Sequence, residues 1–233
     1  DKFDLGTAVH STILKRGANI LECPFDSWRS GDAKLMRDAA RKAGKVPLLT
    51  DQVERVDEMN TAIFGQLNDF PDLAGVFDSA HGAPEVMAAC IDPVGGWTRV
   101  LIDWLGKDLT VWDLKTTDIP VTESRLGRHC DSMGYEWQHA ITERVLCNLY
   151  PELRGRFQFG LIFAETKYPH AIMPIRLPND AIARGRHHVA KSMEMWAACK
   201  ASGEWPAHSG AVRTVEYMPW NIAGFDEYAD ATE

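Results

Sequence analysis

Two carboxylates and one ammonium group interrupt an otherwise apolar stretch, "LIDWLGKDLTVWDLKTT" at residues 101–117. Asp103 and Asp113 lie ten positions apart, and Lys115 follows Asp113 by two positions. Because side chains alternate between the two faces of a strand, Asp113 and Lys115 share one face. A turn centred near Asp108 would pair the two flanking runs as an antiparallel hairpin and set Asp103 opposite Asp113. The pattern therefore predicts two neighbouring carboxylates beside one amine.

Carboxylates at this separation repel each other, and burying them unpaired costs on the order of several kcal/mol. Lys115 neutralises only one of them. A divalent ion corrects the deficit, because Mg²⁺ favours a few carboxylate oxygens completed by water and substrate phosphate. Held by Asp103 and Asp113, such an ion would polarise a phosphoryl oxygen, while Lys115 would orient the attacking water or stabilise transition-state charge. The stretch favours metal-dependent phosphodiester hydrolysis; a solvated hairpin with an ordinary Lys–Asp pair is the alternative.

The composition is that of a globular protein, with 233 residues, 45% of them hydrophobic and 25% charged. We read residues 1–233 as a single domain. The apolar runs are shorter than the roughly 20 residues of a membrane span, and no leader opens the chain, so we expect a soluble, intracellular protein without membrane contact. The abrupt opening leaves open a missing N-terminal segment. Five cysteines without a CxxC pair indicate reduced, structural thiols.

The formal net charge is −8, so a nucleic-acid partner would need a locally basic surface. The segment 33–45 carries five basic residues, among them Arg37 and Arg41, and Arg125 with Arg128 forms a smaller pair. These four arginines are candidate contacts to DNA phosphates. Solvated helix faces are the alternative explanation for each group.

Periodicity and turn residues predict an α/β domain with a central mixed sheet flanked by helices. The first element is a helix ending near Gly17 with His10 on it, and Thr50 is the expected N-cap of a later helix. The expected helices cover about 3–17, 31–43, 51–65, 131–149 and 178–203, with a loop at 44–50. The expected strands cover 85–91, 97–105 and 109–117 as an antiparallel meander, then 156–166 and 171–177. No GxxxxGK[ST] phosphate loop occurs, so we expect no ATP-driven motor.

Five segments, in order, resemble motifs of one nuclease family. They are "DLGTAVH" at 4–10, "GKVPLLT" at 44–50, "IDWLGKDLTVWDLKTTDI" at 102–119, "YEWQ" at 135–138 and "EWPAHSGAVRTVEYMPWNIAGFDEYA" at 204–229. The chain resembles the PD-(D/E)xK nuclease superfamily, more specifically the exonuclease domain of exodeoxyribonuclease VIII (RecE type), and more distantly the lambda exonuclease group. The resemblance implies the restriction-endonuclease-like fold of that superfamily.

The resemblance also implies roles for individual residues. The implied metal ligands are Asp103, Asp113, the backbone carbonyl of Leu114 and the imidazole of His10. Lys115 would be the catalytic lysine, Glu85 an acidic residue near the site, and Gln138 with Tyr135 would help to place the scissile phosphate. Each role has an alternative. His10 would have a packing role, and Glu85 would be a solvated residue at a strand edge. Gln138 and Tyr135 would belong to an ordinary amphipathic helix.

As a whole, the resemblance implies an ATP-independent 5′-to-3′ exonuclease that acts on the ends of linear double-stranded DNA and leaves 3′ single-stranded tails for annealing-type recombination. It implies Mg²⁺ as cofactor, with Mn²⁺ as a substitute, and a single-strand annealing protein as partner. It further implies a homo-oligomeric ring, trimer or tetramer, in the cytoplasm of a bacterial host, encoded by the bacterium or a phage. An endonuclease or junction resolvase on the same scaffold, and an inactive DNA-binding module, are the alternatives.

Overall fold

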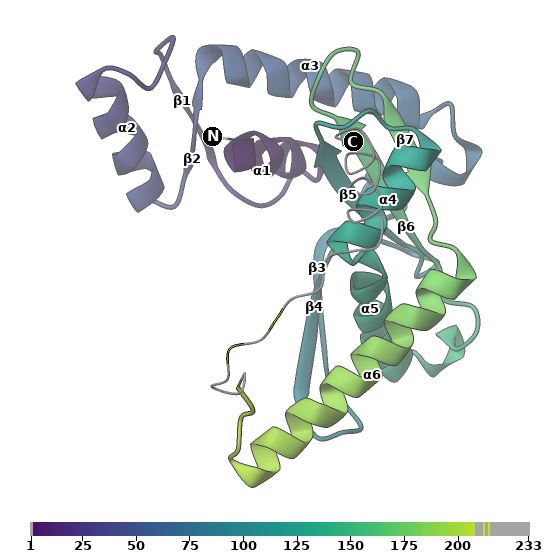
Figure 1. Ribbon diagram of the computed structural model, residues 1–233. Coiled ribbons are helices and arrows are strands. Elements are labelled where there is room, and N and C mark those ends of the chain that lie inside the picture. The colour runs from purple at the N-terminus through teal and green to yellow at the C-terminus, as the bar shows by residue number, and fades with distance from the viewer. Residues whose placement is uncertain (1, 208–211, 213, 215–233) are drawn as a thin grey trace, which may run out of the picture. The chain divides into compact units, whose positions relative to one another are not determined.

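The structure is a computed structural model that describes residues 2–207, 212 and 214 (Figure 1). The chain divides into two compact units, Asp1–Ala197 and Ala198–Glu233. The sheet, the candidate site and all contacts discussed below belong to the first unit. Most of the C-terminal motif at 204–229 lies outside the described residues, and the reading of residues 1–233 as a single domain stays a prediction.

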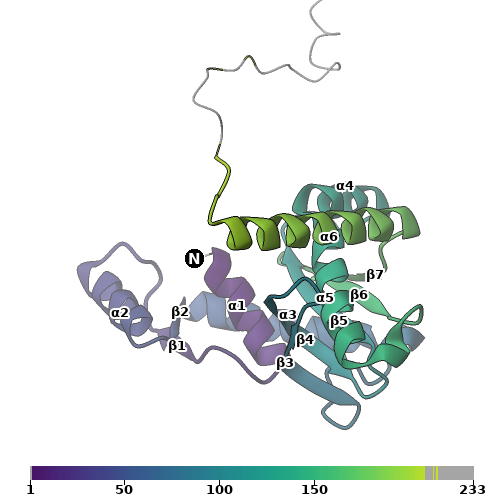
Figure 2. The same cartoon turned by 90° about the horizontal axis from the view of Figure 1, so that it is seen from below.

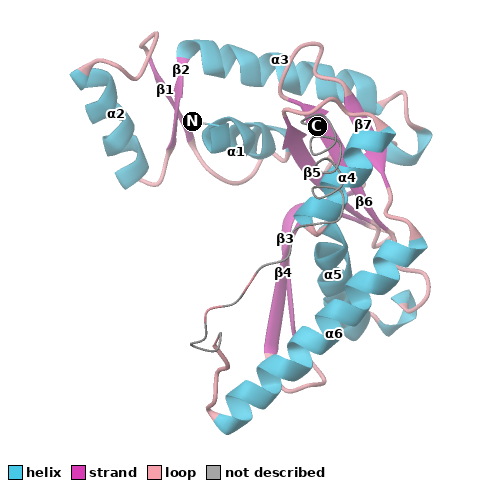
Figure 3. Ribbon diagram, in the orientation of Figure 1, coloured by secondary structure: helices cyan, strands magenta, loops and turns pink. Residues whose placement is uncertain are grey.

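A mixed sheet of five strands, ordered β3-β4-β5-β6-β7, forms the centre of the described part of the chain (Figure 3). The strands are β3 (Gly82–Ile91), β4 (Trp97–Gly106), β5 (Val111–Thr117), β6 (Phe159–Glu165) and β7 (Ile172–Ile175). β3, β4 and β5 pair in antiparallel fashion, β6 runs parallel to β5, and β7 is antiparallel to β6. The predicted α/β fold with a mixed sheet and an initial meander is therefore confirmed.

The β4–β5 hairpin has the register expected from a turn centred on Asp108. Trp104 pairs with Trp112 and Leu105 pairs with Val111, so each pair is symmetric about that residue. The six residues of β5 from Val111 to Thr116 are buried or half-buried, since β5 has neighbours on both sides. The hairpin is thus central to the sheet, which makes its charged residues costly to bury unless they are paired.

Helices cover both faces of the sheet (Figure 2). On one side α1 (Lys2–Ile13) and α3 (Thr50–Leu67) pack on Trp104, Trp112 and Leu114. On the other side α4 (Glu123–Met133) and α5 (Tyr135–Leu149) pack on Val111 and on β6. The last helix is α6 (Asn179–Ser202). No helix in the described part of the chain combines the length and apolar character that a membrane span requires.

Three sequence-based expectations were wrong. The expected loop at 44–50 contains the strand β2 (Val46–Leu49), which pairs in parallel with the unexpected strand β1 (Ile20–Cys23) around α2 (Gly31–Lys42). The N-cap of α3 is Leu49 rather than Thr50, which is the first helical residue. The helix expected from about 131 begins at Tyr135, because Gly134 adopts a left-handed conformation and separates α5 from α4.

Candidate active site

Three carboxylate residues line up across neighbouring strands of the sheet: Glu85 on β3, Asp103 on β4 and Asp113 on β5. The β3–β4 pairing runs from Pro84–Trp104 to Val86–Ile102, which leaves Glu85 opposite Asp103. The regular pairing of β4 with β5 ends at Trp104–Trp112, and one step further the Leu114 backbone N–H donates to the Asp103 carboxylate, which joins Asp103 to β5 beside Asp113. The three residues therefore follow one another from β3 to β5, and Glu85 lies in the interior of its strand rather than at the start.

Glu85 adopts a positive backbone angle, φ +52°, within a β-strand. A residue with a side chain rarely takes this left-handed conformation, and such positions cluster at functional sites. The residues on either side of Glu85 pair with β4, but Glu85 itself does not, so β3 bends where the acidic row begins.

The Asp103 carboxylate is held by the neighbouring strand and by α1. Its Oδ2 accepts a hydrogen bond of 2.9 Å from the Leu114 backbone N–H. The same oxygen lies 3.4 Å from Nδ1 of His10, and His10 also has a hydrogen bond with the Leu114 backbone. His10, Asp103 and Leu114 thus form one connected polar group between helix and hairpin.

Asp113 is the more deeply buried carboxylate, with a side chain only 5% exposed. Its Oδ2 forms an ion pair with Nζ of Lys115 at 2.5 Å, and the Gln138 side-chain amide donates a hydrogen bond to its Oδ1. The Lys115 ammonium also lies 5.2 Å from the ring centroid of Tyr135. Asp113 therefore fixes the direction of Lys115, and α5 fixes Asp113 through Gln138.

The electrostatics of the site show an excess of negative charge. Burial, then the charges of Asp113 and Glu85, raise the pKa of Asp103 to about 7, although the Leu114 N–H and Lys115 act in the opposite direction. Burial, with a smaller contribution from Lys115, lowers the pKa of His10 below its usual value, so the imidazole is neutral at neutral pH. Burial is the largest cause for both groups, and at Asp103 the neighbouring carboxylates add to it.

Burial raises the pKa of Tyr135 to about 12, which keeps its phenol protonated at neutral pH. The hydroxyl can then donate a hydrogen bond to an anionic group in the site.

A cavity of about 810 Å³ opens over these residues. Of the predicted site residues, His10, Glu85, Asp103, Leu114, Lys115 and Tyr135 line it. Asp113 and Gln138 lie behind Lys115 and support it. The structure therefore brings all eight predicted catalytic and metal-site residues together, while their individual roles stay predictions.

The four arginines predicted to contact DNA do not line this cavity. Arg37 pairs with Asp38 and lies 5.9 Å from the Trp28 ring centroid, and Arg41 forms an ion pair of 2.8 Å with Asp4. Arg125 and Arg128 are exposed on α4. A role of these four residues in DNA binding stays a prediction.

Whether the residues present fit a divalent metal depends on the kind of ion. The described residues contain no group of three or more His, Cys, Asp or Glu side chains placed to hold a metal by themselves. His10 thus contacts Asp103 without completing a three-side-chain set. Mg²⁺, however, is bound by one or two carboxylates together with waters and substrate phosphate. Asp103 and Asp113 fit this mode, and their uncompensated charge favours a dication.

Several lining residues were not predicted from the sequence. His129 and Met133, on α4, form a wall of the cavity near Tyr135, and Thr7 with Ser11 on α1 lies on another side. The α4 residues were missed because the helix itself was not expected. The spacing of Thr7, His10 and Ser11 on one helix was the available signal for α1, since positions three and four apart share a face.

Comparisons with known proteins show the family and a similar fold. The model of the family described as "PDDEXK-like domain of unknown function (DUF3799)" matches residues 3–217. The crystal structure of a "putative exonuclease" from Eubacterium rectale is similar in fold, with a TM-score of 0.54 and 13% identity over 94% of this chain and 77% of that chain. The crystal structure of SSO0001 aligns at 14% identity over 84% of this chain and 85% of its own, with a TM-score of 0.28, too low to carry an argument. No curated protein matches the chain.

Proposed function

The chain belongs to the PDDEXK-like family DUF3799, and we propose that it is a metal-dependent nuclease whose active site is the acidic row over β3, β4 and β5. Membership of the PD-(D/E)xK superfamily confirms the resemblance seen in the sequence. One observation carries the proposal: Glu85, Asp103 and Lys115 line one cavity in the sheet, and Asp113 is paired to Lys115 directly behind it.

The residues of the site divide the work of phosphodiester hydrolysis. Asp103 and Asp113 would hold the divalent metal, which supplies charge to polarise the phosphoryl oxygen and acidify a bound water. Lys115, directed by Asp113, stabilises negative charge that builds on the phosphate in the transition state. Gln138 keeps Asp113 in place, and the protonated Tyr135 offers a hydrogen bond to a phosphate oxygen.

In its finer form, the proposal is an Mg²⁺-dependent, ATP-independent exonuclease that resects linear double-stranded DNA from 5′ to 3′. The similarity to exodeoxyribonuclease VIII and the fold shared with a protein called a putative exonuclease support this choice. The net charge of −8 would repel DNA from most of the surface, so a basic lining provided by a ring of copies would help to hold the duplex. A single-strand annealing protein would take up the 3′ tails.

The test is digestion of linear duplex labelled separately at its 5′ and 3′ ends, in Mg²⁺ or EDTA, beside a covalently closed plasmid. We expect metal-dependent release of the 5′ label and an intact plasmid. Lys115→Ala should lower the rate about 100- to 1000-fold. The matched control is Lys107→Ala, since Lys107 is an exposed lysine at the turn of the same hairpin and should leave the rate unchanged.

The outcomes separate the alternatives. Cleavage of the closed plasmid would replace the exonuclease by an endonuclease or resolvase. Binding of DNA without cleavage in Mg²⁺ or Mn²⁺ would reduce the protein to a DNA-binding module. Cleavage that persists in Lys115→Ala would remove the acidic row as the active site.

A further inference from the structure

The cavity over the acidic row has two chemically different walls. Lys115 is the single lysine or arginine among its described lining residues, and it lies next to the carboxylates. The wall formed by α4 and the start of α5 consists of His129, Met133 and Tyr135, joined by Ile119 from the preceding loop. Apart from the Tyr135 hydroxyl, this wall presents ring faces and apolar side chains, which suit a flat, uncharged group.

The rings of this wall are fixed by packing. The His129 ring meets Tyr135 edge to face, with centroids 5.8 Å apart, and meets Phe163 in the same manner at 5.9 Å. Phe163 is completely buried in the sheet and anchors both rings, since its centroid lies 5.8 Å from that of Tyr135. Met133 is 58% exposed and offers a polarizable thioether at the edge of the wall. The wall is therefore preorganised rather than formed by mobile side chains.

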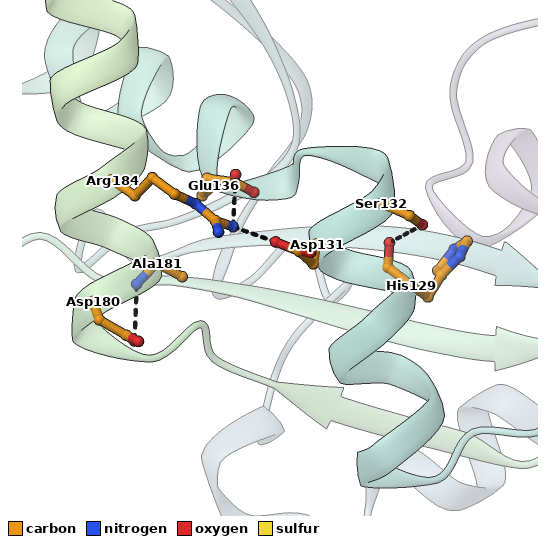
Figure 4. A network of polar contacts seen from close by, with 7 residues as sticks. All are labelled: His129, Asp131, Ser132, Glu136, Asp180, Ala181 and Arg184. Atoms are coloured by element: carbon orange, nitrogen blue, oxygen red, sulfur yellow. Dashed lines mark hydrogen bonds and ion pairs between the residues drawn. The ribbon is translucent and has the colours of Figure 1, made fainter. Parts of the chain in front are cut away.

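A network on the other side of α4 sets the direction of this helix. The Arg184 guanidinium donates a hydrogen bond of 2.6 Å to Asp131 and one of 3.0 Å to the buried Glu136 (Figure 4). In Figure 4 the His129 ring points away from this network, toward the opposite side of the helix. The left-handed Gly134 then turns the chain between α4 and α5. As a result, residues before and after the turn contribute to one wall.

We propose that His129, Met133 and Tyr135 form a nucleobase subsite, in which the base of a nucleotide stacks while its phosphate lies at Lys115. The subsite takes a single-stranded or unpaired nucleotide, because a base within a duplex has no free face to offer. It is tolerant of sequence, since every base has a π face and stacking distinguishes the bases only weakly. The phosphate position in this inference rests on the proposed nuclease function, whereas base stacking on the wall does not.

The test measures binding rather than cleavage. The competitors are six-nucleotide single-stranded DNAs that either carry all their bases or have one abasic residue, placed at each position in turn. They compete with a labelled oligonucleotide in a fluorescence-anisotropy titration in Ca²⁺. A denaturing gel verifies that the DNAs are not cleaved. For the parent protein, an abasic residue at one position should weaken binding roughly 5- to 150-fold, the range of one base–aromatic stack. His129→Ala and Met133→Ala should each bring the ratio of the two affinities, for intact and for abasic DNA, toward one.

Matched controls separate the subsite from general effects. Met87→Ala alters a methionine that is 65% exposed on β3, and His187→Ala alters an exposed histidine on α6; neither residue lines the cavity. Both should keep the full discrimination, and so should His129→Phe, which retains a ring. Thermal unfolding verifies that each variant is folded.

The inference is overturned if the parent protein binds intact and abasic DNAs equally at every position, or if His129→Ala and Met133→Ala discriminate as strongly as the parent. Failure of the nuclease proposal leaves a different signature. In that case no label is released from linear duplex in Mg²⁺, while the discrimination between intact and abasic DNA persists.

Discussion

Asp103→Asn tests whether the acidic row is short of positive charge. The substitution removes the negative charge but keeps an oxygen that can accept the hydrogen bond from the Leu114 N–H, so the hairpin contact survives. In the parent protein, burial and the nearby Asp113 and Glu85 charges raise the pKa of Asp103 from 3.8 to about 7. The unfolded chain has the ordinary pKa, because these neighbours are then far away.

The sign and size follow from proton linkage. Between pH 4 and 7 the folded protein holds a proton on Asp103 that the unfolded chain has released, so raising the pH favours unfolding. A shift of about 3 units at about 1.4 kcal/mol each gives at most about 4 kcal/mol. Asp103→Asn should match the parent protein near pH 4 and exceed its free energy of unfolding by up to about 4 kcal/mol near pH 8.

The assay is urea denaturation of both proteins in EDTA from pH 4 to pH 8. Asp92 and Asp4, whose pKa values are lowered in the folded protein, make the free energy of unfolding depend on pH in the opposite direction. Their contributions are the same in both proteins, so they cancel in the difference between the two free energies of unfolding. Parallel stability curves across this range would refute the reasoning, because Asp103 would then carry no excess cost. Addition of Mg²⁺ at pH 8 should reduce the difference, since an ion bound to the folded parent stabilises it by mass action.

Three further predictions concern other parts of the chain. Arg144→Met should lower the free energy of unfolding by about 3–5 kcal/mol, because it leaves the fully buried Asp92 carboxylate without its guanidinium partner. Urea denaturation at pH 7 measures this loss, and a change below about 1 kcal/mol would contradict the prediction. Gly185→Ala should destabilise the protein by about 1–3 kcal/mol, since a Cβ there would lie 2.2 Å from the Glu136 carbonyl oxygen. Gly127→Ala, in open space on α4, should instead stabilise it by up to about 1 kcal/mol. Equal effects of the two substitutions in thermal unfolding would argue against the close helix contact. Gln138→Leu should lower the rate of duplex digestion about 10- to 100-fold and the free energy of unfolding by about 1–3 kcal/mol, because the buried Asp113 loses the amide that holds it. An unchanged rate would show that Asp113 needs no such support.

The central hairpin could be predicted from the sequence because two independent signals agreed on it. Alternation indicated which residues of β5 share a face, and the turn near Asp108 gave the register in which Trp104 pairs with Trp112 and Leu105 with Val111. The small β1–β2 pair gave neither signal. Each of its strands has four residues, too few to show a period, and Pro47 suggested a loop although proline is tolerated where a strand lies at a sheet edge.

The cavity wall on α4 could not be predicted for a different reason. Residues 122–149 contain two glycines, Gly127 within α4 and Gly134 at the break, and an isolated glycine inside a helical pattern does not tell whether the helix continues. The left-handed conformation at this residue is stabilised by the packing of α4 and α5 on the sheet. Without the break, His129 and Tyr135 could not be recognised as neighbours, because their contact depends on the turn between the two helices.

Residue alternation also fails along β4, at the position of Asp103 in the candidate site. Ile102 and Trp104 should face the same side of the sheet, yet Ile102 belongs to the core beneath α4 and α5, whereas Trp104 packs with α1 and α3. The strand therefore rotates at Asp103, just as β3 bends at Glu85. Regular pairing is interrupted at these points, so the Leu114 N–H takes the Asp103 carboxylate as its acceptor. Glu85 and Asp103 therefore reach the cavity at positions where the sheet departs from ideal geometry, whereas Asp113 lies in the regular β5–β6 pairing and supports Lys115 from behind.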